Sequence, residues 1–599
     1  MSLSTTFMPM LILLSLPFVL AAPPSPDELD DFKRYRSRIL ESHRHLPHDH
    51  RSIQEMGWDI QHYSFHLRFW PDRKELEGSV SIEANRTTGG QFVLHSGGPQ
   101  ISDIQVNGQS VNWQNRSDSI ILPTPDEESI TVEAQWTSRS NRSTLGGLNW
   151  ENNVIYSQNQ PESARKWLIS HDNPADKATL SWKITAPNNL IVAANGELLS
   201  TQTDNGWTTW NWSFAGQIPT YLMAVHLSEY NVLEWGDNLP ITAWVYPGTE
   251  EQAMEVLGTT EQIIDHFSNL YGPYPWSRYG NAIAPMQGAV ENTMVTTFGE
   301  DLIFSDWGEM MNAREIGHHW WGNNVTIGSW SDIWLNEGFA SYSESLWYEQ
   351  YYGSDGLKEY VDMQTESYRE WSEAEQNTTV HDPSLTWGEG IHDKGAVILH
   401  MLRGIIGDDV FFESLRNYEN QYRFSNAATS DFIRSVSETA GEDMSWFFDG
   451  WLYTVGEPIY TYEVQSTQLD SDVYQVDVIV SQDKTEFSMP LPIQIQLKDG
   501  TIIDDEVWVT EQGGQHTFCV TSPLEKTTID PDYWLPLVGL QQGSFEKAPQ
   551  SCPVPVAEQL QGCACSATHH SSGWWLGIAI LAMAQRRRQS ASTVPLSQQ

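Results

Sequence analysis

Hydrophobic and polar residues alternate along the first third of the chain, from about residue 55 to residue 235. Every second position is hydrophobic in two of these runs, at Tyr63, Phe65, Leu67 and Phe69 and again at Ile130, Val132 and Ala134. Successive side chains of a strand point to opposite faces, so this alternation predicts strands with one buried face. Turn dipeptides such as Asn107-Gly108 and Asn195-Gly196 separate the runs. We therefore predict an N-terminal antiparallel β domain over residues 55–235.

The hydrophobic spacing changes at about residue 250 to that of a helix. The positions that fit one helical face are Met254, Leu257, Ile263, Ile264, Phe267 and Leu270. Helical patterns continue to about residue 455, which predicts a mainly helical domain over residues 236–457. Further on, an alternating run up to Leu497 precedes Asp499-Gly500, a pair typical of a hairpin turn. This predicts a small C-terminal β domain over residues 458–540, and the chain as a whole is expected to be an α+β multidomain protein.

Both ends of the chain differ from this globular part. Residues 1–22 contain an apolar core followed by small residues, which is typical of a secretory signal peptide. Residues 23–54 begin as a Pro-rich linker and become charged, and a short amphipathic helix is expected there. Residues 541–572 are predicted to form a linker. In residues 573–599 an apolar run of about 13 residues precedes an Arg cluster, and this run is shorter than the roughly 20 residues that span a bilayer.

Two interpretations of this C-terminal tail remain open. Its Cys residues, short apolar run and basic stop resemble the C-terminal sorting tails of myxobacterial-type surface proteins. The alternative is a weak membrane anchor with the basic residues inside. Either one places the protein outside the cytoplasm, secreted or attached to the cell surface, and we expect a bacterial envelope. In an oxidising compartment Cys519 and Cys552 can pair, although their spacing does not establish a disulfide.

The composition limits the classes of partner. The 599 residues include 78 acidic and 33 basic ones, which gives a net charge of −45. A nucleic-acid-binding protein needs a basic footprint, so we expect no nucleic-acid partner. The acidic balance fits a heavily hydrated surface or a preference for basic peptides. The first of the four Cys residues is Cys519, far in sequence from the motif described next, which argues against thiol catalysis.

The segment Arg314-Glu315-Ile316-Gly317-His318 differs at one residue from the zinc-peptidase pattern H-E-x-x-H, and Glu337 follows His318 after nineteen residues. Positions i and i+4 of a helix lie on one face, so two His residues there can bind one metal ion. The Glu beside the first His then acts as general base on the metal-bound water. By this pattern Glu315 is the candidate base, and His318 and Glu337 are candidate ligands.

Arg314 occupies the position of the first ligand and cannot fill that role. A guanidinium stays protonated and has no lone pair to donate. At 4 Å and an effective dielectric of 20, a dication and a guanidinium repel by roughly 8 kcal/mol. Structural zinc in peptides is bound by roughly 10–16 kcal/mol, so this repulsion and a lost ligand are expected to remove most of the binding free energy unless Arg314 turns away from the site. Paired with Glu337, Arg314 would resemble a built-in replacement for the metal.

Five segments of the chain resemble the zinc aminopeptidase family of aminopeptidase N and leukotriene hydrolase, whose members are gluzincin metallopeptidases. In family order they are residues 157–187, Gly288-Ala289-Val290-Glu291-Asn292, residues 314–344, Ile391-His392-Asp393-Lys394-Gly395-Ala396 and residues 445–460. The resemblance covers roughly residues 55–540. It implies a thermolysin-like catalytic domain, one zinc ion as cofactor, and peptides or protein N-termini as partners.

The resemblance also implies a substrate site. Glu291 would hold the free α-ammonium of a peptide, with help from Gln160 and Gln158. This is sound chemistry, because carboxylate and amide oxygens accept the hydrogen bonds that an ammonium donates. Gly288 and Ala289 would expose backbone to an extended peptide.

His392 is a second departure from the family pattern, because it lies at or beside the position of a Tyr that stabilises the oxyanion. A His can donate that hydrogen bond, so His392 is a candidate catalytic residue together with Glu315. Alternatively, His392 is a migrated ligand that completes a metal site with His318 and Glu337. A third interpretation is a buried polar His without a catalytic role. His319 points about 100° away from His318 around the helix, so we expect it to be no ligand.

Two functions therefore remain open. The first, which we favour, is an extracytoplasmic protein that recognises the free N-termini of peptides, with hydrolysis impaired or lost. The second is an active zinc aminopeptidase with a rebuilt or weak metal site, formed by His318, Glu337 and, in one version, His392. The sequence does not decide whether zinc binds.

Overall fold

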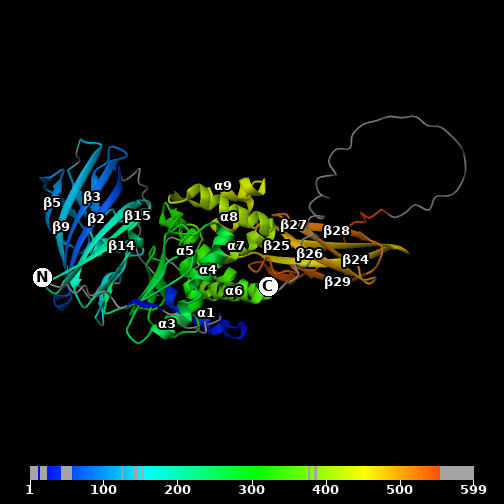
Figure 1. Cartoon of the computed structure of the whole chain (residues 1–599). Coiled ribbons are helices and arrows are strands. Elements are labelled where there is room, and N and C mark those ends of the chain that lie inside the picture. Colours follow the sequence, from blue (N-terminus) through cyan, green and yellow to red (C-terminus); the bar gives the residue numbers. More distant parts are fainter. Residues whose placement is uncertain are drawn as a thin grey trace, which may run out of the picture. The chain divides into compact units, whose positions relative to one another are not determined.

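The computed structural model describes residues 11–13, 23–41, 57–123, 126–139, 146–151, 153–374, 378–383 and 388–553. Most of the expected signal peptide and all of the expected tail over residues 573–599 lie outside the described residues. One compact unit extends to Cys552. Figure 1 shows its N-terminal strands in blue, its helices mainly in green to yellow and its C-terminal strands in orange.

The N-terminal part is built from strands, as the alternation predicts. Its largest sheet has the strand order β14-β15-β12-β2-β3-β9-β5-β6. In that order the strands are β14 (Glu197–Asp204), β15 (Trp207–Ile218), β12 (Ala178–Pro187), β2 (Trp58–Trp70), β3 (Glu75–Arg86), β9 (Ser129–Arg139), β5 (Gln100–Val106) and β6 (Gln109–Ser110). The predicted turn at Asn107-Gly108 joins β5 to β6. The hydrophobic parity of β2 is buried, so the sheet has the predicted core face.

One strand pair in this sheet differs from the antiparallel expectation. β2 and β12 run parallel, with Tyr63 opposite Leu180. The two strands are far apart in sequence, so no short hairpin dictates their direction. Two smaller sheets complete this part, with the orders β10-β11-β16-β13 and β4-β8-β7. Their strands are β10 (Gly147–Glu151), β11 (Val154–Gln158), β16 (Val225–Ser228), β13 (Ile191–Ala194), β4 (Phe92–His95), β8 (Ser119–Leu122) and β7 (Gln114–Arg116).

A further sheet leads into the helical part, with the order β1-β17-β18-β19-β21-β20. Its strands are β1 (Leu11–Leu13), β17 (Asn231–Trp235), β18 (Ile241–Val245), β19 (Tyr279–Ala284), β21 (Thr296–Gly299) and β20 (Ala289–Val290). β17 and β18 pair antiparallel, so the expected domain boundary after residue 235 falls inside their hairpin. At the other end of the sheet β20 is the edge strand, which bears on the site described below.

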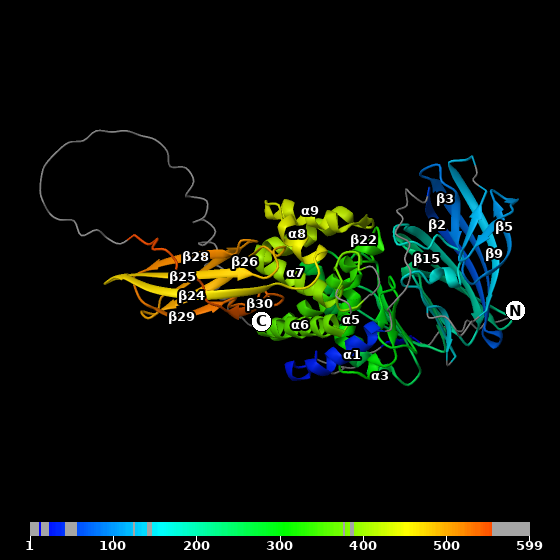
Figure 2. The ribbon, with the colours of Figure 1, turned by 180° about the vertical axis from the view of Figure 1, so that it is seen from behind.

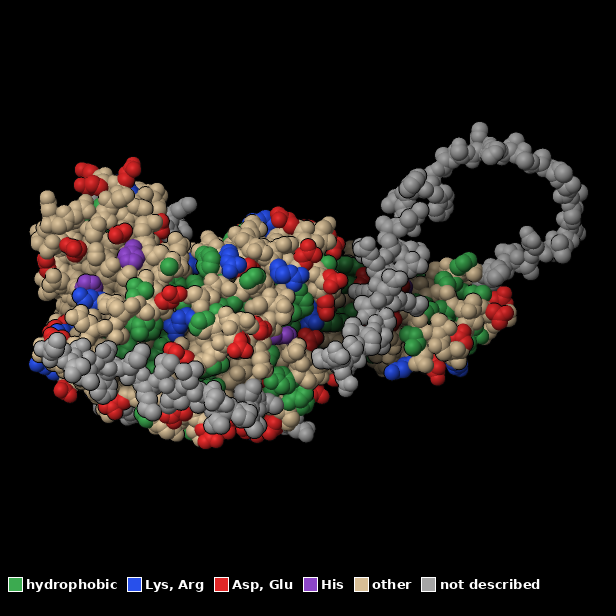
Figure 3. All heavy atoms as spheres, viewed as in Figure 1, with side chains coloured by type: hydrophobic (Ala, Val, Ile, Leu, Met, Phe, Trp, Pro, Cys, Tyr) green, Lys and Arg blue, Asp and Glu red, His purple; other side chains and the backbone are tan. Residues whose placement is uncertain are grey.

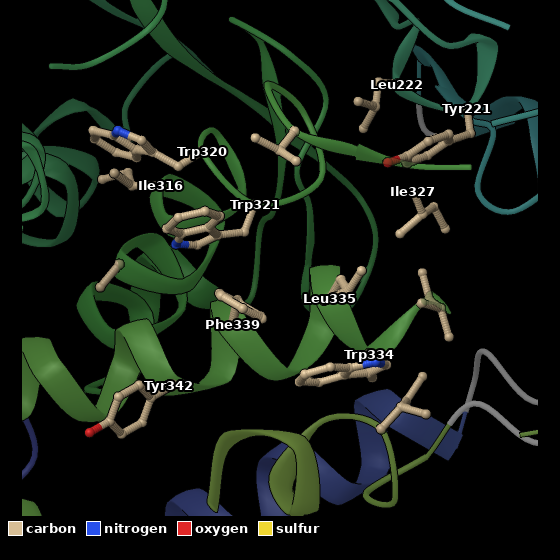
Figure 4. Close-up of a cluster of buried hydrophobic side chains, with 14 of the residues drawn as sticks. Tyr221, Leu222, Ile316, Trp320, Trp321, Ile327, Trp334, Leu335, Phe339 and Tyr342 are labelled. Atoms are coloured by element: carbon tan, nitrogen blue, oxygen red, sulfur yellow. The ribbon is translucent and has the colours of Figure 1, made fainter. Parts of the chain in front are cut away.

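The helices follow the predicted change of period. They are α3 (Glu250–Leu257), α4 (Thr260–Tyr271), α5 (Gly308–His318), α6 (Trp334–Ala374), α7 (Asp393–Ile406), α8 (Asp408–Tyr422), α9 (Thr429–Ala440) and α10 (Ser445–Tyr453). The helix expected in the charged N-terminal segment is α1 (Leu29–Glu41). Figure 4 shows Trp321 and Trp334 on either side of Phe339 of α6, with ring centroids 5.0 and 5.8 Å from that of Phe339. This buried aromatic cluster fixes the start of α6.

The C-terminal part consists of two sheets, with the orders β28-β25-β24-β30 and β27-β26-β29. Their strands are β24 (Ile459–Asp470), β25 (Val473–Gln482), β26 (Met489–Leu497), β27 (Ile502–Val509), β28 (Gly514–Val520), β29 (Leu524–Ile529) and β30 (Gly539–Gln542). β26 and β27 form the predicted hairpin around Asp499-Gly500. Cys519 and Cys552 are joined by a disulfide, the pairing that their spacing left open.

Two properties of the surface bear on partners. Acidic side chains are spread over the face shown in Figure 3 and do not gather at one place. Within the described residues, no helix is long and apolar enough to span a membrane.

Candidate active site

Two close backbone contacts bring the predicted site residues together. A Cβ atom added at Gly317 of α5 would lie 2.7 Å from the Ser343 side chain of α6, so only Gly allows these helices to approach so closely. A Cβ atom added at Gly338 of α6 would likewise lie 3.0 Å from the backbone of Gly395 in α7. The first contact places Arg314, Glu315 and His318 beside Glu337, and the second places His392, the residue before α7, on the same side.

Arg314 forms the ion pair with Glu337 that the sequence suggests. Its Nη2 donates to Glu337 Oε2, and its Nη1 donates to Ser341 Oγ at 2.7 Å. Nη1 also lies 3.6 Å from Glu344 Oε1, and Nε lies 3.7 Å from Glu315 Oε1. Only 7% of Arg314 is exposed. Burial lowers its pKa, but Glu337, Glu344 and Glu315 more than offset this, so the guanidinium is held in its charged form.

Arg314, His318, Glu337 and His392 form what we call the metal half of the site. One oxygen of Glu337 lies near a nitrogen of each of the other three residues. Besides Arg314, His392 Nε2 lies 3.2 Å and His318 Nε2 lies 3.6 Å from Glu337 Oε2. Burial raises the pKa of Glu337, but His392, His318 and Arg314 lower it by more than burial raises it, so the net shift is downward. Glu337 is therefore a carboxylate whose negative charge is satisfied by groups of the protein itself.

The two His residues differ in what their second nitrogen contacts. His318 Nδ1 lies 3.2 Å from the Trp321 carbonyl oxygen, to which it donates. Burial lowers the pKa of His318 to about 3, so the ring is neutral with its lone pair on Nε2. His392 Nδ1 donates to the Gly388 carbonyl at 2.8 Å, and its Nε2 faces Glu337. His392 thus contacts Glu337, whichever of its three proposed roles holds.

Glu315, the candidate base, has no partner for one of its oxygens. It is buried, and Oε2 has no hydrogen-bond partner within the part of the chain that the structure describes. Burial raises its pKa well above the usual range and outweighs the opposing effect of Arg314, while Glu291, Glu337 and Glu344 raise it further. The surroundings of Glu315 therefore disfavour its ionised form, which is the form that a general base needs.

Of the residues expected to hold a peptide amine, which we call the amine half of the site, Gln160 and Glu291 are in contact and Gln158 is not. Gln160 Nε2 donates to Glu291 Oε1 at 3.0 Å and lies 3.4 Å from Glu337 Oε1. Burial and then the Glu337 charge raise the pKa of Glu291 to about 8. Gln158, at the end of β11, pairs with Gly147 of β10, and no hydrogen bond among the described residues joins it to Glu291. Gln158 is therefore not part of this contact.

Gly288 and Ala289 lie where an extended peptide could pair. Gly288 has a positive φ of 72°, and its carbonyl accepts from Gly299 N at 2.8 Å. Ala289 begins β20, which pairs with β21 on one side only. An edge strand presents unpaired backbone groups, which is how extended peptides are commonly bound. Glu291 directly follows this strand.

Two alternatives for a metal can be compared with these distances. Arg314 pairs with Glu337 Oε2, the oxygen that His318 and His392 also face, so the residues as placed do not fit a zinc ion held by His318, Glu337 and His392. Among the described residues, a group with ligand atoms within 4.8 Å of one another is Glu291, Glu315 and His318. His319 is no ligand to either group, because its Nδ1 donates to the Glu315 carbonyl and its Nε2 accepts from Met294 N.

Several residues that contact the site could not be recognised from the sequence. Ser341, Glu344 and Asp393 lie within the motif blocks but carried no assigned role. Glu344 forms an ion pair with Arg314 and Asp393 forms one with Arg36, while Ser341 accepts a hydrogen bond from Arg314. Arg36 reaches the same cluster from α1, where the charged composition of residues 27–52 predicted only a short helix. A local sequence pattern could not have linked Arg36 to this cluster.

Comparison with known proteins identifies the family to which this fold belongs. Residues 60–222 match the peptidase M1 N-terminal domain, and residues 255–451 match the peptidase family M1 domain. The chain belongs to the peptidase M1 family. The resemblance to zinc aminopeptidases is thereby confirmed, as is the order of a β-rich N-terminal domain, a helical catalytic domain and a C-terminal β region. Solved relatives in the M1 family are zinc metallopeptidases, so zinc is the cofactor that this family implies.

The chain spans at most about 60% of the length of the first curated M1 relatives. Probable aminopeptidase 1 of Sulfurisphaera tokodaii is 24% identical over 75% of this chain and 60% of its own length. Aminopeptidase N of Rattus norvegicus is 26% identical over 62% of this chain and 43% of its own length. The chain is therefore similar to aminopeptidases. Because the match covers only part of each relative, the activity of the whole relative cannot be assigned to this chain.

Solved M1 structures share the fold. A two-domain M1 zinc metallopeptidase variant bound to L-tryptophan is 25% identical with a TM-score of 0.58, over 64% of this chain and 93% of that one. Aminopeptidase A of Legionella pneumophila, in complex with aspartic acid, has a TM-score of 0.71 at 17% identity, over 83% of this chain and 61% of that one. At this identity the second match shows the fold alone.

Proposed function

We propose that this M1-family protein binds the free N-termini of peptides and that hydrolysis is impaired or lost. The observation that carries the proposal is the buried Arg314–Glu337 ion pair. It puts a permanent cation at the first ligand position and uses the carboxylate that would otherwise face the metal. The raised pKa of Glu315 supports the same conclusion, because burial disfavours the carboxylate that a general base needs.

The amine half supports the binding part of the proposal. Glu291 is buried, its pKa is raised to about 8, and a neutral amide is its hydrogen-bonded side-chain partner. An incoming ammonium would favour ionisation of this acid and complete its pairing. The free edge of β20 offers backbone groups to the residues that follow the peptide's N-terminus. Recognition would thus need no metal.

Metal analysis and peptide binding on the purified full chain test the proposal. We expect less than stoichiometric zinc, no release of N-terminal residues, and binding of a tripeptide that is weakened when its amine is acetylated. Stoichiometric zinc together with peptide turnover would contradict the loss of hydrolysis. Equal binding of the free and acetylated tripeptides would contradict the assigned amine site.

The second candidate function is an active zinc aminopeptidase with a rebuilt metal site. It is favoured by the proximity of the ligand atoms of Glu291, Glu315 and His318, which lie within 4.8 Å of one another. This function predicts stoichiometric zinc in the unmodified protein that is lost in His318→Ala. If His392 instead completes the site, His392→Phe should release the metal, whereas the Glu291 arrangement predicts release by Glu291→Ala.

The proposal includes an extracytoplasmic location. The Cys519–Cys552 disulfide supports it, because disulfides persist mainly in oxidising compartments. Mass spectrometry of the protein recovered from its host tests this point. A mature N-terminus near residue 23 in the envelope or medium is expected, whereas an intact N-terminus in the cytoplasm, with both Cys residues reduced, would contradict it.

A further inference from the structure

The N-terminal helix α1 packs against the catalytic domain next to the metal half of the site. Figures 1 and 2 both show α1, in dark blue, beside α6 and α3, and residues of α1 and α6 are in contact. Phe32 is fully buried and stacks on Trp307, with ring centroids 5.2 Å apart. Tyr35 adds a hydrogen bond to Asp301 at 3.0 Å. This segment is therefore an integral part of the catalytic domain, although it precedes the family match.

Arg36 of α1 carries its guanidinium into a buried acidic cluster. Only 4% of Arg36 is exposed, and its partners Glu344 and Asp393 are fully buried. Nη1 donates to Asp393 Oδ1 at 2.6 Å, Nε lies 3.3 Å from Glu344 Oε2, and Nη2 lies 3.4 Å from Ser341 Oγ. A fork of donors that engages two carboxylates at once is what a guanidinium can provide and an ammonium cannot.

The partners of Arg36 lead directly to both positions at which the site departs from the family pattern. Glu344 Oε1 lies 3.6 Å from Arg314 Nη1, and Ser341 Oγ accepts from Arg314 at 2.7 Å. Asp393 directly follows His392, whose Nε2 faces Glu337. One residue on each side therefore separates Arg36 from Arg314 and from His392.

The distribution of charge explains what Arg36 does. Four carboxyl groups with ion-pair partners surround the two guanidiniums: Glu315, Glu337, Glu344 and Asp393. Arg36 satisfies Asp393 and one oxygen of Glu344, which leaves Arg314 free to pair with Glu337. Without Arg36, Glu344 and Asp393 would be buried without adequate compensation, and Arg314 is a cation already within 3.6 Å of Glu344. Its guanidinium would turn towards Glu344 and release Glu337.

We propose that Arg36 is a positioning residue that holds Arg314 on Glu337, so that the N-terminal segment itself helps to exclude a metal ion from the site. This inference rests on the proposed function, because it takes the Arg314–Glu337 pair as the resting state. It adds that the pair depends on a segment outside the matched family domains.

Zinc titration of full-length Arg36→Gln tests the proposal, with zinc chloride alone as the probe and calorimetry as the readout. We expect Arg36→Gln to bind Zn²⁺ at least tenfold more tightly than the unmodified protein, because Glu337 becomes available. Lys33→Gln on the same helix is the matched control, since Lys33 pairs with the exposed carboxylates of Glu366 and Glu370. It should leave zinc binding unchanged. Arg36→Lys, which keeps the charge and loses the fork, should fall between.

A second variant covers the case in which Arg36→Gln does not fold. Arg36→Gln combined with Asp393→Asn removes one cation and one carboxylate, so the buried charge stays balanced while Glu344 still loses its ion pair with Arg36. This double variant should also gain at least several-fold in zinc affinity, with a circular dichroism spectrum like that of the unmodified protein. Zinc binding unchanged in the folded variants would overturn the role of Arg36 alone. Tight stoichiometric zinc in the unmodified protein would overturn both this role and the proposed function.

Discussion

The two halves of the site satisfy their buried carboxyl groups in opposite ways. On the metal side Glu337 forms an ion pair with Arg314, His392 Nε2 lies 3.2 Å from the same carboxylate oxygen, and the pKa of Glu337 is lowered. On the amine side Glu291 has a neutral amide partner, and its pKa is raised to about 8. Among the described residues Glu291 has no cationic hydrogen-bond partner, so a cationic ligand can still pair with it. Glu337 is already paired with Arg314 of the protein itself. This contrast is what the proposed function requires, with ammonium binding at Glu291 and no metal ion at Glu337.

Restoring the missing ligand should have the largest effect on this contrast. In Arg314→His we expect zinc affinity to rise at least roughly a thousandfold, or about 4 kcal/mol, because a lone pair replaces a repulsion of roughly 8 kcal/mol. Zinc calorimetry and assay of N-terminal residue release measure the result. Arg314→Met, which removes the charge and adds no ligand, should gain less. Equal gains in the two variants would show that charge alone kept zinc away.

The second largest effect should be on stability. Glu337→Gln leaves Arg314 buried without its closest carboxylate, and breaking such a pair costs about 3–5 kcal/mol. Glu291→Gln is the matched control on the amine side. It replaces a protonated acid by an amide of similar shape, so its cost should stay within about 1 kcal/mol. Urea unfolding measures both, and similar losses in the two variants would remove the distinction between the halves.

Peptide affinity should depend on the amine side of the site, where the expected effect on stability is small. Glu291→Gln should weaken binding of a free-amine tripeptide by roughly 10- to 100-fold, because a hydrogen bond to a charged group contributes about 1.5–3 kcal/mol. Binding of the N-acetylated tripeptide should not change. Fluorescence titration of both peptides provides the comparison. A free-amine affinity that survives this substitution would move the amine site elsewhere.

The smallest effect is expected at Gln160. Gln160→Ala removes a neutral hydrogen bond, so free-amine affinity should fall by about two- to tenfold, or about 0.5–1.5 kcal/mol. Gln158→Ala serves as its control, because Gln158 makes no hydrogen bond to Glu291 among the described residues. The same titration separates them. A loss at Gln158 as large as that at Gln160 would show that the bound state differs from this arrangement.

The sequence predicted those features that depend on local spacing. The alternation in β2, the helical period from residue 250 and the turn at Asp499-Gly500 each depend on neighbours within one element, and the structure confirms them. The Arg314–Glu337 pair was also foreseeable, because the known motif states which positions of two helices face one ion. The amine pair of Gln160 and Glu291 followed from the family resemblance.

Features that depend on distant packing were not foreseeable. The parallel pairing of β2 and β12 joins strands far apart in the chain, and no periodicity records its direction. Arg36 and Asp393 are separated by 357 residues, so no local sequence pattern predicts their contact. Gln158 and Gln160 look equivalent in sequence, but the chain turns from β11 at Gln158 and directs only Gln160 to Glu291.

The buried position of Arg36 has a practical consequence for where this protein should be cut. Family similarity starts at residue 60, so a fragment chosen by homology would contain every recognised motif and omit α1. Such a fragment would carry Glu344 and Asp393 inside its interior with their counter-ion deleted. Low yield, aggregation or adventitious metal in that truncated product would then reflect the missing helix, and expression designs should retain the chain from residue 23 onward.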